Sequence, residues 1–275
     1  SEFRGDTMSC MEASLAGDID LAVCLGGNLL ASNPDTTFAV SAMSNINLVA
    51  YMSTTLNQGH VLGRGAETIV LPVIARDEES QVTTQESMFN FVRRSTGGEA
   101  RHEGLRSEVD IIVDFASNGV GTIEWEKYRD HDFIRSLMAC CMKGFDEKHE
   151  HQIEGRTFHN PTFNTANGRV QSHAVSITVP RSIQGNQFRL MTIRSEGQFN
   201  TVVYEEEDVF RKQNRRDIVM LHSADMERLE LREDDWVTVQ GTTGTLDVVV
   251  RSVEIAKGNC AMYFPEANIL LSHDV

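Results

Sequence analysis

The chain has 275 residues, enough for one large domain or two of ordinary size. Hydrophobic residues make up 40% of it, and 40 acidic residues against 25 lysines and arginines give a net charge of −15. Such a surface repels nucleic-acid backbones and anionic membranes, so we expect neither as a partner. An anionic cofactor would need local arginines, backbone N–H groups or helix N-termini.

The five cysteines are scattered and show no C-x-x-C spacing. This pattern excludes a zinc ribbon or an iron–sulfur cluster built from this chain alone, and it is typical of reduced thiols in a cytoplasmic protein. No signal-like start and no apolar run near the ~20 residues of a membrane span is present. The opening Ser1-Glu2-Phe3 resembles a cloning scar, so we expect the chain to begin within a longer polypeptide.

The first half alternates strands with helical stretches. We predict strands at 19–25, 47–52 and 68–73 and a helix over 36–44, an alternation typical of a parallel sheet with helical crossovers. Residues 102–115 and 126–142 have helical character, and the apolar face of the second of these predicts that Cys140 and Cys141 fill a core. Residues 144–168 are polar and are interpreted as a connector.

The second half is richer in short strands. Strands are predicted at 188–193, 217–221, 236–240, 244–253 and 260–264, with a short helix at 225–231. Gly241-Thr-Thr-Gly244 separates two of them as a tight turn. Closely spaced strands with few helices favour a β-barrel.

Two motifs follow strands of the first half. The loop LGGNLLASNPD at 25–35 places two glycines after the first strand, where backbone N–H groups can approach a phosphate. Asn28 and Ser32 add polar side chains to this loop. The run STTLN at 53–57 follows the second strand, and ligands of doubly wound sheets lie beyond the carboxyl ends of the strands. Each motif by itself is better explained as an ordinary turn or polar loop.

Two further motifs belong to the second half. In MTIRSEGQFNT, at 191–201, a strand ends in an arginine that can form two bonds to a phosphate, followed by a glycine and several polar side chains. In YFPEAN, at 263–268, a strand leads into a proline and polar residues. A simple surface hairpin would explain Gly197, but it would not explain the polar residues crowded after it.

In this combination and order, LGGN-x3-SNPD, TTLN, VLP at 70–72, MTIRSEGQFNT and YFPEAN resemble the distal half of molybdopterin oxidoreductases. The resemblance is greatest to the formate dehydrogenase-like branch, which carries a bis-guanine-dinucleotide cofactor. The acidic stretch 229–237 and Arg215-Arg216-Asp217 fit the same branch. The resemblance extends from about residue 7 to residue 271, and its specificity comes from five separated motifs that agree.

The resemblance implies an α/β plus all-β fold. Residues 1–165 would form a partial dinucleotide-binding-like parallel α/β domain with a helical extension, and residues 180–275 a double-psi β-barrel that binds the molybdopterin dinucleotide. It also implies, by position, a set of cofactor-binding residues: Gly27, Asn28, Ser32, Asn57, Arg194, Gly197, Gln198, Asn200, Thr201 and Asn268.

The implied cofactor is molybdopterin guanine dinucleotide, with molybdenum or tungsten held mainly by an amino-terminal part of the enzyme. That part, in the same chain or in a partner subunit, is the expected macromolecular partner, and formate or a similar small molecule is the expected substrate. Nothing here matches the family's cluster-binding cysteines or its metal-ligating Cys or selenocysteine, so we expect no catalytic or metal-ligating residue in this chain. The acidic residue often found near Met52 in the family is absent too. We therefore expect this chain alone to have no catalytic activity.

Other readings are weaker. His149 and His151, with Asp146 and His159 nearby, lie in the polar connector and are interpreted as a solvated segment and not as a metal site. The alternative function is a non-catalytic double-psi barrel that serves as a protein-interaction module. The RSEGQFNT cluster disfavours this alternative, because a pure interaction barrel does not need it.

Overall fold

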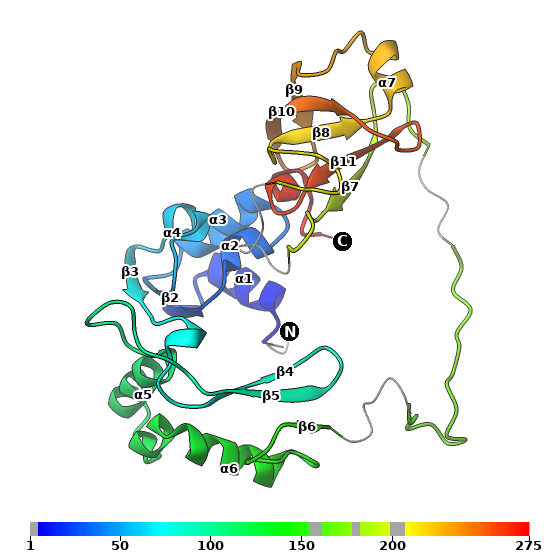
Figure 1. The fold of residues 1–275 in the computed structure, drawn as a ribbon. Coiled ribbons are helices and arrows are strands. Elements are labelled where there is room, and N and C mark those ends of the chain that lie inside the picture. Colours follow the sequence, from blue (N-terminus) through cyan, green and yellow to red (C-terminus); the bar gives the residue numbers. More distant parts are fainter. Residues whose placement is uncertain (1–4, 154–160, 178–181, 199–206, 275) are drawn as a thin grey trace. The chain divides into compact units, whose positions relative to one another are not determined.

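The computed structural model describes residues 5–153, 161–177, 182–198 and 207–274 (Figure 1). Packing divides the chain into two units. The first, the split unit, joins Ser1–Leu71 with Val179–Val275, and the second, the middle unit, is Pro72–Thr178. The expected family domains, 1–165 and 180–275, stay a prediction, because a division of the chain into packed units does not test the bounds of family domains.

The first part of the split unit contains helices and a small sheet, in the order α1 (Thr7–Ala16), β1 (Leu21–Leu25), α2 (Leu29–Ser32), α3 (Thr36–Ser44), β2 (Leu48–Ser53), α4 (Gln58–Leu62) and β3 (Glu67–Pro72). The sheet order is β1-β2-β3, and β1 runs parallel to β2. The predicted strands and the helix over 36–44 are confirmed within one or two residues. The helix starts at Thr36 because the side chain of Asp35 accepts a hydrogen bond from the Phe38 N–H, at 3.0 Å.

The two faces of this sheet differ. One face packs against the helices. The hydrophobic core between this face and the helices includes Leu30, Met43, Val49 and Tyr51. On β1 the alternate side chains Leu21, Val23 and Leu25 are 50%, 44% and 50% exposed. Since successive strand residues point to opposite faces, these three apolar side chains share the face turned away from the helical core.

The second part of the split unit is a mixed sheet with short helical segments: β7 (Arg189–Ile193), β8 (Ile218–Leu221), α7 (Ser223–Arg228), β9 (Trp236–Gln240), β10 (Thr245–Ser252), β11 (Asn259–Tyr263) and the 3₁₀ segment η3 (Glu266–Leu270) (Figure 1). The strand order is β7-β11-β8-β10-β9. The pairs β7–β11 and β8–β10 are parallel, whereas β8–β11 and β9–β10 are antiparallel. All five predicted strands are confirmed, and the whole fold is mixed α/β.

Both faces of this second sheet are covered. Val219 and Val250 belong to one buried cluster, and Met220 and Val249, their neighbours along the strands, belong to another. This explains why β8 is an uninterrupted apolar run and does not alternate with polar residues.

The middle unit contains a hairpin, β4 (Thr83–Glu86) and β5 (Phe91–Ser95), extended by β6 (His151–Gln152), with the helical segments η1 (Arg76–Glu78), α5 (Glu108–Gly119), η2 (Trp125–Arg129) and α6 (His131–Cys141). The hairpin was not predicted, because its strands are polar. The predicted helix over 126–142 is broken in two at Asp130, whose side chain accepts the N–H of Asp132 at 2.8 Å and caps a new helix.

The prediction that Cys140 and Cys141 fill a core is wrong, because both are exposed. The buried residues of α6 are instead His131 and Arg135, one helical turn apart. The Arg135 guanidinium donates to the Val82 carbonyl oxygen at 2.6 Å, and His131 Nδ1 lies 3.2 Å from the same oxygen. This polar contact with the strand segment determines which side of α6 faces inward.

The described residues contain neither a membrane-spanning helix nor a metal-binding group of side chains. Every helix within those ranges is too short or too polar to cross a membrane. Across the same ranges, His, Cys, Asp and Glu side chains form no group of three that could hold a metal ion.

Candidate cofactor site

The loop after β1 is shaped by glycine and capped by its own asparagine. Gly26 has φ 65°, a conformation that favours glycine, and its N–H donates to the Met52 carbonyl at 2.8 Å. Gly27 is exposed, whereas Asn28 is 4% exposed. Asn28 Oδ1 accepts the Ala31 N–H at 3.1 Å, and the exposed Ser32 donates its hydroxyl to the Asn28 carbonyl at 2.7 Å. The loop is therefore a fixed turn at the carboxyl end of β1.

The predicted residue Asn57 meets Asn28 at Gly59. Asn57 Oδ1 accepts the Gly59 N–H at 2.8 Å and caps α4. A Cβ atom placed on Gly59 would lie 2.7 Å from Asn28 Oδ1 and 3.0 Å from Asn57 Oδ1. Two residues predicted from separate motifs thus bring their amide oxygens to one glycine, beyond the ends of two parallel strands.

His60 is a residue of this cluster that the sequence reasoning missed. It is 8% exposed, its Nδ1 accepts the Asn57 N–H at 2.9 Å, and its ring meets the ring of Tyr51 edge-on at 4.7 Å. Its Nε2 is buried without a hydrogen-bond partner among the described residues. Burial lowers the pKa of His60, which favours the neutral form of the ring. The sequence contains no pattern that would have predicted the burial of His60 beside Asn57 and Tyr51.

The second candidate cluster is the turn after β7. Arg194 is exposed, with its guanidinium 5.2 Å from the centre of the Phe264 ring. Gly197 is exposed with φ 69°. Gln198 is 6% exposed, and its Nε2 donates to the Phe264 carbonyl at 2.8 Å. The predicted residues Asn200 and Thr201 lie outside the described residues.

The segment 264–268 links the two clusters. One end accepts the hydrogen bond from Gln198, and the other carries Asn268, which is 2% exposed. Asn268 Nδ2 donates to the carbonyl oxygens of Ala31 and Asn33, both at 2.8 Å, and the Asn268 carbonyl accepts the Asp35 N–H at 2.9 Å. The predicted residue Asn268 thus fastens the loop that follows β1.

A second contact strengthens this link. His273 stacks on Phe38 with ring centres 3.9 Å apart, and its Nδ1 lies 2.7 Å from Asp35 Oδ2. Asp35 itself has φ 54°, unusual for a residue other than glycine. The two parts of the split unit therefore meet through polar groups on the loop 25–35.

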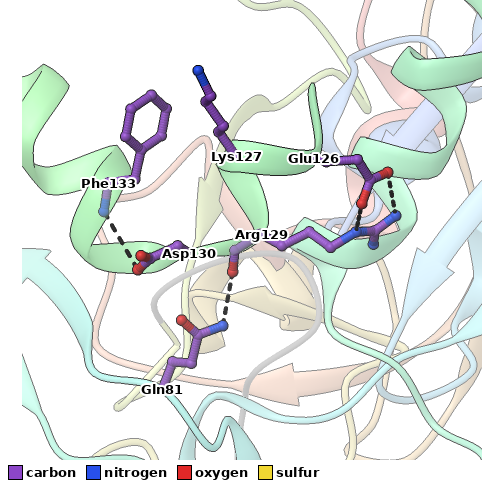
Figure 2. Close-up of a pocket in the computed structure, with 6 residues that line it drawn as sticks. All are labelled: Gln81, Glu126, Lys127, Arg129, Asp130 and Phe133. Carbon is purple, nitrogen blue, oxygen red and sulfur yellow. Dashed lines mark hydrogen bonds and ion pairs between the residues drawn. The ribbon is translucent and has the colours of Figure 1, made fainter. Parts of the chain in front are cut away.

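A shallow hollow in the middle unit is a different feature (Figure 2). It is lined by Gln81, Glu126, Lys127, Arg129, Asp130 and Phe133. Gln81 Nε2 donates to the Arg129 carbonyl at 2.8 Å, and Arg129 Nε donates to Glu126 Oε2 at 2.7 Å. None of the predicted site residues lines this hollow, and its polar groups largely bond to one another.

The histidines of the connector form local turns. His149 Nδ1 lies 3.0 Å from Asp146 Oδ2, and His151 Nε2 accepts the Asp146 N–H at 3.1 Å. Here the histidines bond to the groups of a local backbone turn. His159 lies outside the described residues.

The carboxyl-terminal third of the chain is similar to a known protein family. Residues 188–274 match the family described as the molydopterin dinucleotide binding domain. The comparison thus supports a molydopterin dinucleotide-binding domain in this part of the chain. This domain starts at β7 and includes Arg194, Gly197, Gln198 and Asn268. It supports molybdopterin guanine dinucleotide as the cofactor, and it favours cofactor binding over a pure interaction barrel.

Relatives extend the likeness over nearly the whole chain. An uncharacterized oxidoreductase of Mycobacterium tuberculosis, Rv2900c, is 28% identical over 98% of this chain and 38% of its own length. Protein YdeP of Escherichia coli K12 is 23% identical over 97% of this chain and 39% of its own length. The chain therefore spans about two fifths of these curated relatives.

A solved structure shows the same fold. Acetylene hydratase from Pelobacter acetylenicus superposes with a TM-score of 0.69 at 15% identity, over 98% of this chain and 43% of its own. At this identity the likeness shows the fold alone.

Proposed function

We propose that this chain is the cofactor-binding, carboxyl-terminal portion of a molybdopterin-dependent oxidoreductase of the formate dehydrogenase-like branch. The observation that carries the proposal is the contact of Asn268 with Ala31 and Asn33. It joins the domain matched by the family to the glycine loop after β1, so candidate residues from both ends of the sequence belong to one packed unit.

The available groups suit an anionic dinucleotide. The exposed Arg194 can donate two parallel hydrogen bonds to a phosphate. Gly27 and Gly197 are exposed and have no Cβ, so a phosphate can approach their backbone. Arg211 and Arg216 hydrogen-bond to the same turn as Arg194, but each is paired with a carboxylate, Asp208 and Glu266 respectively, so they support the turn without adding net positive charge.

Each set of residues has its own task in this proposal. Gly27, Ser32 and Asn57 contact one guanine dinucleotide, and the buried Asn28, together with Asn57, fixes the shape of the loops. Arg194, Gly197, Asn200 and Thr201 hold phosphate and pterin, while the buried Gln198 and Asn268, whose side-chain amides bond to the protein, keep the turn 194–198 and the loop 25–35 in place beside the pterin. When bound, the cofactor supplies the metal-centred redox chemistry, while the protein binds it, orients it and excludes water.

The proposal includes a double-psi β-barrel and an amino-terminal partner. Parallel strand pairs placed among antiparallel ones support the barrel. The apolar side chains Leu21, Val23 and Leu25, exposed on β1, support an amino-terminal part that covers this face, because α/β sheets bury both faces. The free, scattered cysteines support a cytoplasmic location.

The deciding experiment is metal and oxidised-pterin analysis of the protein at its natural length, isolated from its own cells. We expect molybdenum or tungsten together with a released guanine-dinucleotide pterin. A protein without metal and pterin would contradict the proposal and would support the protein-interaction module instead.

Arg194→Ala provides the residue-level test. We expect this variant to keep the fold but lose about tenfold or more in cofactor retention, because a charged bidentate contact is removed. Arg232→Ala, at another exposed arginine in the turn before β9, is the matched control and should retain cofactor normally. Equal retention in both variants would contradict the assignment of Arg194.

Formate as the substrate is tested on the same preparation. We expect formate-dependent reduction of an artificial electron acceptor by the cofactor-loaded protein. Activity with another small molecule but not with formate would keep the cofactor proposal and remove the formate branch.

A further inference from the structure

The turn 194–198 is held by a second arginine. Arg216 Nη1 donates to Ser195 Oγ at 3.0 Å, and Arg216 Nη2 lies 3.2 Å from Gln198 Oε1. The same nitrogen donates to the Phe264 carbonyl at 2.6 Å. One guanidinium therefore contacts both ends of the short turn that follows Arg194.

Arg216 is itself fixed from two directions. Its Nε donates to Glu266 Oε1 at 2.6 Å and its Nη2 to Glu266 Oε2 at 3.0 Å, a bidentate pair. Its guanidinium also lies 4.8 Å from the centre of the Tyr263 ring. Only 14% of the side chain is exposed, so water competes weakly for its donors.

A neighbouring arginine fixes the start of the turn. Arg211 Nη1 donates to the Arg194 carbonyl at 3.1 Å and to Asp208 Oδ2 at 2.6 Å. Tyr263 donates its hydroxyl to the same Asp208 oxygen at 2.8 Å. The turn is thus supported by two arginine–carboxylate pairs, and Tyr263 contacts both.

The turn's own hydrogen bonds depend on this support. The Ser195 N–H donates to Gln198 Oε1 at 3.1 Å, and the Gln198 N–H donates to the Ser195 carbonyl at 3.2 Å. The oxygen that receives the Ser195 N–H is the one that Arg216 contacts. Without Arg216, the Gln198 side chain would lose one of the contacts that set its orientation.

We propose that Arg216, paired with Glu266, is a positioning residue that presets the turn 194–198 for the anionic part of the cofactor. Arg216 acts through Ser195 and Gln198, and does not itself touch the ligand. This inference rests on the proposed function for its ligand, but the preset turn is a property of the protein alone. Because the contacts use the planar, forked shape of the guanidinium, a lysine with the same charge should not replace it.

The test is hydrogen–deuterium exchange of the backbone amides of Ser195 and Gln198 in the full chain. We expect Arg216→Met and Arg216→Lys to speed this exchange about tenfold or more, with β8 and β10 unchanged. Arg215→Met is the matched control, because the neighbouring Arg215 pairs with Asp217 and lies over Trp236, away from the turn. It should leave the exchange of the turn as it is.

Exchange that stays slow in folded Arg216→Met would overturn the proposal. So would exchange that rises equally in the turn, β8 and β10, because that result indicates a purely structural role. If Arg216→Met does not fold, Glu266→Gln is the variant to measure, because it weakens the ion pair with Arg216 while the side chain at position 266 keeps its volume. We expect local acceleration in this variant too, and an unchanged turn would count against the proposal.

A second readout connects the turn to the cofactor. In the natural-length, cofactor-loaded protein, Arg216→Lys should lose guanine-dinucleotide pterin about tenfold faster than Arg215→Met. Equal loss rates would contradict the role of Arg216 in cofactor retention. A wild-type protein without cofactor would contradict the proposed function, and the exchange experiment would still decide whether Arg216 presets the turn.

Discussion

The side chain of Asn268 donates both amide hydrogens to backbone carbonyls of the loop after β1, at 2.8 Å to Ala31 and 2.8 Å to Asn33. The amide is almost completely buried, and the two carbonyl groups belong to a short helix and its end. Helix ends leave carbonyl groups unpaired unless another group reaches them. Asn268 supplies that group from a distant part of the chain.

Replacing Asn268 tests this contact. Asn268→Asp keeps the shape but removes both donors and places a carboxylate beside two carbonyl oxygens. We expect the free energy of unfolding to fall by about 2 kcal/mol or more. Ser32→Ala is the control, because the exposed Ser32 makes a local bond only, and it should change stability by less than about 0.5 kcal/mol. Denaturant unfolding measures both, and similar small changes would show that the buried contact contributes little.

Gly59 is the position where the loops of Asn28 and Asn57 meet. Gly59→Ala would place a Cβ 2.7 Å from Asn28 Oδ1, so one loop must move. We expect a loss of about 1–3 kcal/mol in stability and weaker cofactor retention. Gly119→Ala, at the end of α5 where the space is open, should be neutral or slightly stabilising. Normal stability and retention in Gly59→Ala would mean that the close approach of the two loops is unimportant.

The Asp208 carboxylate gives a pH-dependent contribution. Burial raises the pKa of Asp208, but hydrogen bonds from Arg211 and Tyr263 outweigh burial, so the pKa falls below the ordinary value of 3.8. A lowered pKa stabilises the fold above about pH 4, and this stabilisation is lost as the pH falls through the folded-state pKa. We expect Asp208→Asn to cost about 1–3 kcal/mol at pH 7, and the difference from wild type to shrink below pH ~4. A constant difference across this range, in unfolding measured at each pH, would exclude the ionic contribution.

The exposed face of β1 allows a test of whether another part of the protein covers this sheet. Val23→Thr keeps the β-branched shape and should change the stability of this chain by less than about 0.5 kcal/mol. In the natural-length protein we expect a loss of about 1–3 kcal/mol, because the hydroxyl would be buried in an apolar contact. Val175→Thr, at a side chain that is 83% exposed, should be neutral in both. An equally small effect of Val23→Thr in the natural-length protein would argue against a covering partner.

Local sequence patterns predicted the strands and some of the helices of the split unit. The run 36–44, between two apolar strand-like runs, predicted a helix, and apolar runs predicted the strands of both parts of the split unit. Such patterns work because capping and side-chain periodicity act between residues close in the chain. Five separated motifs in order indicated the cofactor family, and residues 188–274 match its dinucleotide binding domain.

The tertiary structure decided which predicted groups lie together. Asn268 and Ala31 are 237 residues apart in sequence, and Arg216 and Glu266 are 50 apart, so no local pattern could pair them. The same limit explains the error at Cys140 and Cys141: the inward side of α6 depends on a bond from Arg135 to Val82, 53 residues earlier. Hydrogen bonds of this kind form only after the backbone has closed long loops, so their partners are chosen by packing and not by neighbouring residues.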